Sequence, residues 1–467
     1  MNYILSIIGK FEYHDVNFAI NKEHHNAKIL SVAMYNYLTS KGEECRLVLF
    51  VPESLVGMLE EDIDGAYKLL NDRKELKDRV LKELIENGAV TDKNVDIRII
   101  QSIGEYSAQG KYSLLFINHL DNIMFQVFTE LIDMFNMDGK VFIDISIGHN
   151  VYVYSLLEAL RSIIVYSKLK TLLQDEYGLK VIIASSPPIF TKGLSVNAEF
   201  HDYDVKAFFE LPLKNIKDYS VSVGSFLHDK SIINELLREF KAQNIDLDPL
   251  KHDLELLRKS FNALKYNIPL AFFNSNILNL EEASIDKNKR FIINLTSLLE
   301  KQFRSIRIND SYINIHRKYW VNRVFLTNVM FSLALLESIA GFWRSKVSGK
   351  QPSLNYILNV FGDVYDKLGI KLNRRFLERD IIEIENRIQS CKEKLDSYKP
   401  LSTIVRRYGD EDVKEYIVSD PKRNFFAHSG LIKDFIEAKL NDEINVRYID
   451  KPDVTNQISS WINNPEK

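Results

Sequence analysis

Cysteine is scarce, because the 467 residues include only Cys45 and Cys391. Two cysteines so far apart fit neither a disulfide framework nor the ligand spacing of a zinc site. We therefore expect a reducing compartment, the cytoplasm. The adjacent His24 and His25 would point apart in a regular element, so we predict no metal site.

Repeats, low-complexity tracts and Gly/Ser linkers are absent, and one apolar run alone is long enough to cross a membrane. That run, residues 324–343, contains Asn328 and Glu337. Polar and charged residues are costly inside a bilayer, so we predict a central helix of a bundle and no membrane partner. Glu337 would then pair with an arginine of the core, such as Arg423. The first ten residues predict a strand rather than a signal peptide, because they lack a basic n-region and the apolar stretch is short.

An excess of positive charge is also missing, since 61 Lys and Arg residues face 64 Asp and Glu residues. This balance excludes a protein that coats duplex nucleic acid, although it allows a local basic groove. Hydrophobic residues make up 45% of the chain, which excludes a disordered protein. The length predicts two or three folded domains.

Short apolar runs alternate with amphipathic helical patterns in the first 215 residues. Near-continuously apolar strands that alternate with helices predict a parallel sheet covered on both faces. The predicted strands span residues 3–8, 46–51, 95–100, 140–147 and 180–185, with a last strand at 206–213. The N-terminal domain is therefore predicted to be α/β and Rossmann-like, with a mostly parallel sheet.

From about residue 220 onward, long segments with a period of 3.6 residues predict a mostly α-helical structure. One boundary falls between residues 213 and 225, and a second near residues 281–290. We therefore expect three segments: a sheet domain at 1–215, a helical connector at 216–290 and a second, helical domain at 291–467.

Loops that follow the predicted strands are the expected ligand site of the sheet domain, because ligands of such sheets bind at the carboxyl ends of the strands. Glycine turns and the start of a helix suit an anionic, nucleotide-like ligand. The alternative is that the glycines only form tight turns and that Asp144 only makes structural hydrogen bonds. The candidate ligand-binding residues are Gly9, Lys10, Ile147, Gly148, His149, Asn150, Ser185 and Ser186.

The segment "SDPKRNFFAHSG", residues 419–430, combines a helix start with three polar side chains. Asp420 and Pro421 predict an N-cap and a first helical position. Asn424 and His428 would share a face, and Arg423 could reach toward them. His428 suits acid/base catalysis, Arg423 a phosphate clamp and Asn424 an orienting role, as RNA cleavage without a metal requires. The alternative is an ordinary solvated helical face.

Residues 304–323 interleave basic and aromatic side chains, which suits phosphate contacts and base stacking on RNA. The alternative is the surface of an amphipathic helix. The residues concerned are Arg304, Arg307, Tyr312, Arg317, Lys318, Tyr319, Trp320 and Arg323.

Two short motifs in this order resemble those of the CARF-HEPN ribonucleases, the stand-alone effectors of type III CRISPR systems. "RNFFAH", residues 423–428, is similar to the family pattern of Arg, commonly Asn, a few variable residues and His. "DISIGHN", residues 144–150, looks like the family's strand-end motif, and the "LSIIGK" and "ASSPP" segments are similar to its ligand-facing loops. The resemblance covers the order and size of the domains, except that residues 220–300 carry no recognisable signature.

The resemblance implies that residues 1–215 form a CARF sensor and residues 291–467 a HEPN nuclease. It implies an activator, cyclic oligoadenylate, with the cyclic tetramer most common in relatives, and no catalytic cofactor. The HEPN site would cut single-stranded RNA without a metal and leave a 2′,3′-cyclic phosphate. Both sites would form across the two-fold axis of a homodimer.

Two other functions stay open at this point. A nucleotide-sensing regulator would bind nucleic acid or a partner without cutting it. A ring nuclease would mainly degrade the cyclic oligoadenylate, and the C-terminal residues would then be dispensable for its principal activity. The set of Arg423, Asn424 and His428 favours the endoribonuclease.

Overall fold

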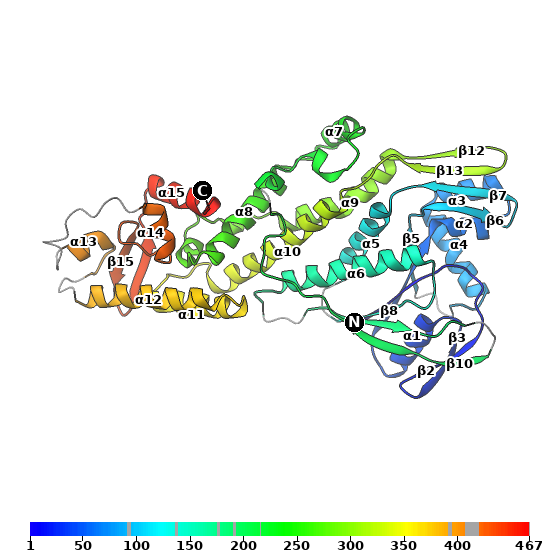
Figure 1. The fold of residues 1–467 in the computed structure, drawn as a ribbon, viewed down its shortest axis with the longest axis horizontal. Helices are drawn as coiled ribbons and strands as arrows, with labels where there is room; N and C mark the ends of the chain where they lie inside the picture. Colours follow the sequence, from blue (N-terminus) through cyan, green and yellow to red (C-terminus); the bar gives the residue numbers. More distant parts are fainter. Residues whose placement is uncertain are drawn as a thin grey trace.

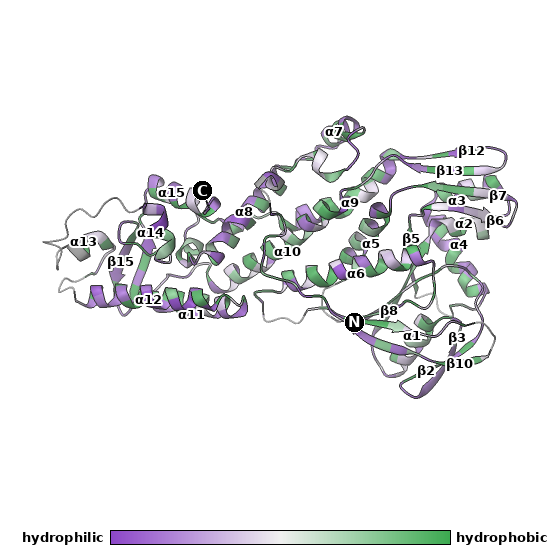
Figure 2. Ribbon diagram, in the orientation of Figure 1, coloured by the Kyte–Doolittle hydropathy of each residue, from purple (hydrophilic) through white to green (hydrophobic). Residues whose placement is uncertain are grey.

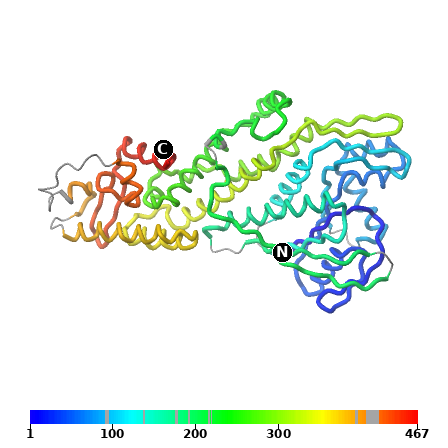
Figure 3. The backbone as a smooth tube through the Cα atoms, in the orientation of Figure 1, coloured from blue at the N-terminus to red at the C-terminus, as the bar shows by residue number. Residues whose placement is uncertain are grey.

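The computed structural model describes residues 1–90, 95–135, 139–174, 178–189, 193–214, 216–390, 395–406 and 420–466. Cys391 lies outside these residues. The molecule is elongated, with the sheets of the first 203 residues at one end and the last helices at the other (Figure 1). Long helices run between the two ends, as the backbone trace also shows (Figure 3).

A six-stranded sheet forms the centre of the N-terminal part. All five expected strands are present and parallel to one another, although the strand expected at 140–147 ends at Asp144. A further strand, β11 (Glu199–Tyr203), pairs antiparallel at one edge. The strand order is β11-β9-β8-β1-β4-β5. Its other members are β1 (Asn2–Ile7), β4 (Cys45–Pro52), β5 (Val95–Ile100), β8 (Lys140–Asp144) and β9 (Lys180–Ser185). The predicted α/β fold with a mostly parallel sheet is therefore confirmed.

Both faces of this sheet are buried, which explains the near-continuous apolar strands. Along β1, Leu5 and Ile7 enter one hydrophobic core, and Ile4 and Ile8 enter the other. Helices α5 (Leu120–Met134) and α6 (Asn150–Lys170) cover the first face. The second face packs against α1 (Leu30–Ser40), α2 (Val56–Leu59), α3 (Ile63–Asn71) and α4 (Arg73–Glu86).

Two smaller sheets flank the central one, and the sequence patterns did not predict them. One contains β2 (Val16–Ile20), β3 (Glu23–Ala27) and β10 (Leu194–Asn197). The other has the order β12-β13-β7-β6, with β6 (Gly104–Ala108), β7 (Tyr112–Ile117), β12 (Arg304–Ile308) and β13 (Tyr312–Arg317). The strand expected at 206–213 is wrong, because these residues run without ladder pairing and Phe208 is exposed.

The C-terminal part is mostly helical, as predicted. Its longer helices are α7 (Ile233–Ala242), α8 (Asp248–Lys265), α9 (Ile285–Phe303), α10 (Arg323–Lys346), α11 (Leu354–Lys367) and α12 (Lys371–Gln389). The end of the chain adds α13 (Leu401–Arg406), α14 (Pro421–Ala427) and α15 (Pro452–Asn463) around a small sheet of β14 (Lys399–Pro400), β15 (Ile436–Leu440) and β16 (Ile444–Tyr448). Short 3-10 segments lie at 53–55, 216–219, 223–226, 269–273 and 280–282. The division of the chain at residues 215 and 290 stays a prediction.

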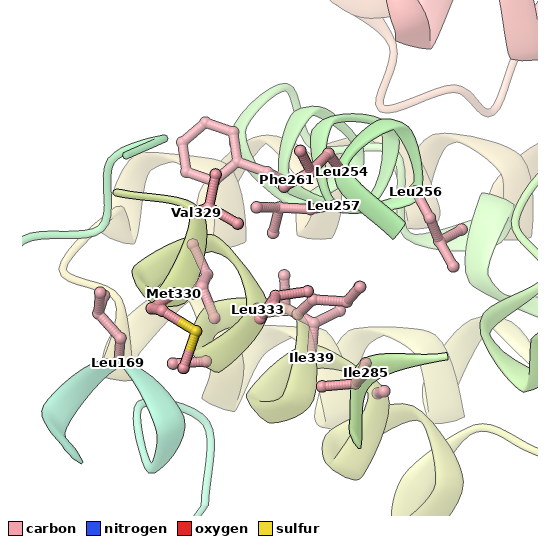
Figure 4. Close-up of a cluster of buried hydrophobic side chains, with 14 of the residues drawn as sticks. Leu169, Leu254, Leu256, Leu257, Phe261, Ile285, Val329, Met330, Leu333 and Ile339 are labelled. Carbon is pink, nitrogen blue, oxygen red and sulfur yellow. The ribbon is translucent and has the colours of Figure 1, made fainter. Parts of the chain in front are cut away.

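Helix α10 is the central helix expected from its apolar sequence. It is long and apolar enough to span a membrane, but 67% of its most apolar window is buried inside the protein. Figure 4 shows Val329, Met330 and Leu333 of this helix among side chains of α8 and Leu169 of the N-terminal part. Hydropathy colouring shows hydrophobic and hydrophilic residues alternating along the long helices, as expected for helices with one buried face (Figure 2).

Among the described residues, Glu337 of α10 pairs with lysines and with no arginine, so that expectation is wrong. Its carboxylate forms ion pairs with Lys289 of α9 and, at 3.5 Å, with Lys170 at the end of α6. Arg423 lies at the far end of the molecule, on α14 (Figure 1). Glu337 therefore links α10 to the N-terminal part instead of the helical end.

The basic and aromatic segment 304–323 forms the β12–β13 hairpin and its exit, and its interpretation as an RNA-binding surface is wrong for Arg317 and Tyr319, which are buried. Arg317 has a fully buried side chain that contacts Glu53 at 2.7 Å and Glu300 at 2.6 Å. Tyr319 is 1% exposed and donates its hydroxyl to Glu300. Arg323 pairs with Asp121 at 2.8 Å. These residues attach the hairpin to the N-terminal part, at the end of the molecule opposite α14 (Figure 1).

Candidate functional sites

A pocket of about 360 Å³ opens where β1 and β8 end. These two strands are neighbours at the point where the strand order reverses, since β4 and β5 lie on one side of β1 and β8 and β9 on the other. Parallel sheets bind ligands at this switch point. Of the predicted residues, the pocket is lined by Gly9, Lys10, Ile147, Gly148 and His149.

The other three predicted residues are not among the described lining residues of this pocket. Asn150 is exposed and begins α6 directly after the lining residue His149. Ser185 ends β9, and the backbone N–H of Ser186 donates to the Ser146 hydroxyl at 2.9 Å. Ser186 therefore fixes the loop after β9 against the loop after β8.

Two glycines allow the loops after β1 and β8 to approach each other. Gly148 has a φ of +100°, and a Cβ there would lie 2.9 Å from the Cβ of Ile7. A Cβ on Gly9 would lie 3.1 Å from the Cα of Gly148. Only glycine fits at position 148, because both the backbone conformation and the neighbouring atoms exclude a Cβ.

Asp144 has the structural role that was kept as an alternative. Its carboxylate is 1% exposed and accepts hydrogen bonds from the N–H groups of Ser31 and Ser146, each at 2.9 Å. Burial raises its pKa, and these hydrogen bonds oppose the rise. Asp144 therefore links the start of α1 to the loop after β8, and that loop lines the pocket.

Sequence reasoning missed Tyr13, which the β1–β2 connection brings into the pocket. Its hydroxyl oxygen accepts from the N–H groups of Gly9 and Lys10 at 3.3 and 3.4 Å. Burial raises the pKa of Tyr13 to about 12, so the hydroxyl keeps its proton at neutral pH and can donate it to a ligand. No local pattern marked Tyr13, because its place depends on how the chain returns toward β2.

The charge of the pocket suits an anionic ligand. Lys10, His14, Lys28 and His149 line it, and its described lining residues include no carboxylate. The remaining lining residues are Ser146, Pro187, Pro188 and Ile189. Lysines and histidines at a helix start favour phosphate groups.

The second site lies on α14, at the other end of the molecule. Asp420 caps this helix as predicted, with its Oδ1 accepting from the N–H groups of Lys422 and Arg423 at 3.0 and 3.4 Å. Pro421 occupies the first helical position. The helix ends after Ala427, because Ser429 has a left-handed φ of +53°.

Asn424 and His428 both line a pocket of about 360 Å³ on this part of the protein. They lie one turn apart, and the N–H of His428 donates to the carbonyl of Asn424 at 3.1 Å. Arg423 lies on the adjacent exposed face of α14 and is not among the pocket's described lining residues. The fold therefore gathers Asn424 and His428 in one pocket and presents Arg423 beside it.

Helix α12 supplies two acidic residues to the same pocket, and sequence reasoning missed both of them. Asp380 is 3% exposed, and its Oδ1 lies 3.8 Å from Nδ1 of His428. Asp380, Glu383 and His428 each carry an atom that could ligate a metal, all within 4.8 Å of one another. Metal-free cleavage thus stays a prediction that experiment must decide.

Comparison with protein families gives two matches. Residues 3–188 match the CARF domain of the CRISPR system endoribonuclease Csx1, and residues 371–451 match the HEPN domain of the same endoribonuclease. Together the two segments span more than half of the chain. The chain belongs to the CARF-HEPN family of CRISPR ribonucleases. No curated protein matches it.

Both sites fall inside the matched segments of this CARF-HEPN ribonuclease. The pocket at β1 and β8 lies in the CARF match, and α12 and α14 lie in the HEPN match. Membership shows a CRISPR ancillary endoribonuclease with a domain that senses cyclic oligoadenylate. The role of each residue in these sites stays a prediction.

Proposed function

We propose that cyclic oligoadenylate, most simply the cyclic tetramer, binds the pocket at β1 and β8 and activates metal-independent cleavage of single-stranded RNA at α14. The observation that carries the proposal is the grouping of Asn424 and His428 in one pocket, with Arg423 beside it. The described lining residues of the CARF pocket include lysines and histidines and no carboxylate, which supports the activator.

Each residue of the HEPN site has a task in this reaction. The 2′-oxygen of one nucleotide attacks the adjacent phosphorus, the bond from phosphorus to the 5′-oxygen breaks, and a 2′,3′-cyclic phosphate remains. His428 transfers the proton that this exchange requires, and Arg423 stabilises the charge that grows on the phosphate. Asn424 orients the imidazole or the RNA.

A homodimer completes both sites in this proposal. A pocket of about 360 Å³ is at the low end of the range for drug-sized ligands, about 300–1,000 Å³, and a ring of four nucleotides is larger than such a ligand. Two pockets across a two-fold axis would share one ring. The exposed Arg423 of each copy would then be available to the pocket of its partner.

Activation requires a physical connection between the two ends of the molecule. Helix α6 begins at the ligand loop and ends beside α10, where the N–H of Leu173 donates to the Ser338 hydroxyl at 2.9 Å. Further along α10, Trp343 donates to the carbonyl of Phe272 at 2.9 Å. Asn267, which precedes Phe272 by five residues, donates to the hydroxyl of Ser429 beside His428 at 2.8 Å. A ring that favours one arrangement of this chain of contacts would shift the active population.

The test compares two site variants in an RNA cleavage assay with the ring present. Arg423→Ala and His428→Ala should each abolish cleavage, while calorimetry shows ring binding equal to that of the wild type. His201→Ala serves as the matched control, since His201 is exposed on β11 at the other end of the molecule. Full cleavage by His428→Ala would remove His428 from the mechanism. Ring degradation without RNA cleavage would favour the ring nuclease, and ring binding without either reaction would favour the regulator.

A further inference from the structure

Asp380 of α12 is a buried carboxylate that faces the imidazole of His428. Its side chain is 3% exposed, whereas that of His428 is 48% exposed, so one side of the ring meets the carboxylate and the rest is open. Oδ1 of Asp380 lies 3.8 Å from Nδ1 of His428. Burying a charged group costs free energy unless other groups form hydrogen bonds or ion pairs with it. The partners of Asp380 therefore show whether the fold stabilises this carboxylate beside His428.

The carboxylate of Asp380 accepts hydrogen bonds from Ser429, which follows α14, and from Arg379, its neighbour on α12. Ser429 donates its hydroxyl to Oδ2 at 2.7 Å, and Asn267 in turn donates to the Ser429 oxygen at 2.8 Å. Arg379 donates to Oδ1 through Nη2 at 2.8 Å. Both oxygens of the carboxylate are therefore fixed in direction, with Oδ1 on the side of His428.

Two residues of this network adopt left-handed backbone conformations, which strain Ser429 but which asparagine tolerates. Ser429 has a φ of +53° and Asn267 a φ of +61°, in the left-handed region that non-glycine residues seldom adopt. Both are buried, at 1% and 5% exposed. A buried polar network that contains a strained residue and lies beside a reactive side chain is typical of a functional site.

We propose that Asp380 is a positioning residue for His428, an inference that rests on the proposed function of the HEPN site. When the RNA is bound, the carboxylate accepts a hydrogen bond from Nδ1–H of His428. This contact fixes the ring's orientation and places the neutral ring's proton on Nδ1. Nε2 is then free to exchange a proton with the RNA.

Asp380→Asn is the direct test, because the amide keeps the size of the side chain and changes a group that only accepts into one that also donates. We expect kcat for ring-activated RNA cleavage to fall about 100-fold, within the usual contribution of a general acid or base, and KM to change less than threefold. Asp380→Glu keeps the carboxylate and should recover part of the lost kcat.

Asp253→Asn is the matched control for a general effect on folding. Asp253 of α8 is also fully buried and accepts from the Ser284 N–H at 2.9 Å and from Asn288 at 2.7 Å. This control should leave kcat and KM unchanged. If both variants lower the melting temperature equally and lose cleavage equally, Asp380 has only a structural role and the proposal is overturned.

A second measurement does not depend on cleavage. Nitrogen-15 NMR of the full-length protein bound to an RNA that lacks the attacking 2′-hydroxyl, with the signal of His428 assigned through His428→Ala, reports which ring nitrogen carries the proton. We expect Nδ1–H in the wild type and a shift toward Nε2–H in Asp380→Asn. If no ring activates the wild type, the proposed function fails, and the NMR result still decides the role of Asp380. An unchanged tautomer together with unchanged kcat in Asp380→Asn would overturn the proposal.

Discussion

A Cβ atom on Gly9 would lie 3.1 Å from the Cα of Gly148, so the loops that follow β1 and β8 meet at these two glycines. The loop after β1 carries Lys10, and the loop after β8 carries His149, the N-cap residue of α6. The close approach therefore brings two candidate ligand groups into one pocket.

Gly148→Ala should weaken binding of the cyclic oligoadenylate at least about tenfold, which corresponds to about 1.4 kcal/mol. The added Cβ would force apart the loop after β8 and Ile7, and it would strain a φ of +100°. Gly42→Ala controls for the strain alone, because Gly42 has a φ of +80° and open space around it. Calorimetric titration with the ring should give wild-type affinity for Gly42→Ala, and equal affinities in both variants would contradict the pocket assignment.

Ser338→Ala should weaken the coupling between ring binding and RNA cleavage. The change leaves the N–H of Leu173 without its partner at the contact between the end of α6 and α10. We expect ring binding within twofold of the wild type and a severalfold smaller stimulation of RNA cleavage, since a typical coupling free energy is about 1–3 kcal/mol.

Ser332→Ala is the control for this experiment. Ser332 is also buried on α10, but its hydroxyl donates to the carbonyl of Asn328 in its own helix. Stimulation should be unchanged in this variant. Equal stimulation in both serine variants would show that the contact between Leu173 and Ser338 carries no coupling.

Glu300→Gln should destabilise the protein by about 3 kcal/mol at pH 7, because Arg317 would lose one of its two buried carboxylate partners. Burial raises the pKa of Glu300, but the charge of Arg317, with Arg73 and Arg304, lowers it further, so the net pKa is below the usual value of 4.5. The stabilisation is therefore complete above about pH 4.5 and disappears as the pH falls through the lowered pKa.

Urea denaturation at pH 7 and at pH 4 checks this prediction. The stability difference between wild type and Glu300→Gln should be smaller at pH 4 than at pH 7. Glu86→Gln, which alters an exposed pair with Lys82, should cost less than about 0.5 kcal/mol at either pH. A difference that grows as the pH falls would contradict the charge assigned to Glu300.

The parts of the fold that local patterns determine were predictable from the sequence. Strands buried on both faces, such as β1 and β8, are continuous apolar runs, and Asp420 with Pro421 marks the start of α14. The sheet that joins β7 and β13 was not predictable, because Phe116 pairs with Ile315 almost 200 residues later. Long-range pairing of this kind leaves no periodic signal in either strand.

The same distinction applies to the sites. The motif that contains Arg423, Asn424 and His428 is contiguous, and so are the glycine loops, so their residues could be singled out. Asp380 lies 48 residues before His428 on a different helix, and only the packing of α12 against the end of α14 shows their relationship. Tyr13 follows Gly9 by only four residues and was missed because its place depends on how the chain returns toward β2.

The most direct test of the account is cleavage of a fluorescent single-stranded RNA by the wild-type protein in EDTA. The reaction is run without a ring and with cyclic tri-, tetra- or hexa-adenylate. The account predicts strong stimulation by one ring and products that end in a 2′,3′-cyclic phosphate. Cleavage that occurs only when a divalent cation replaces EDTA would contradict it and would make Asp380, Glu383 and His428 the first residues to test as ligands of the cation.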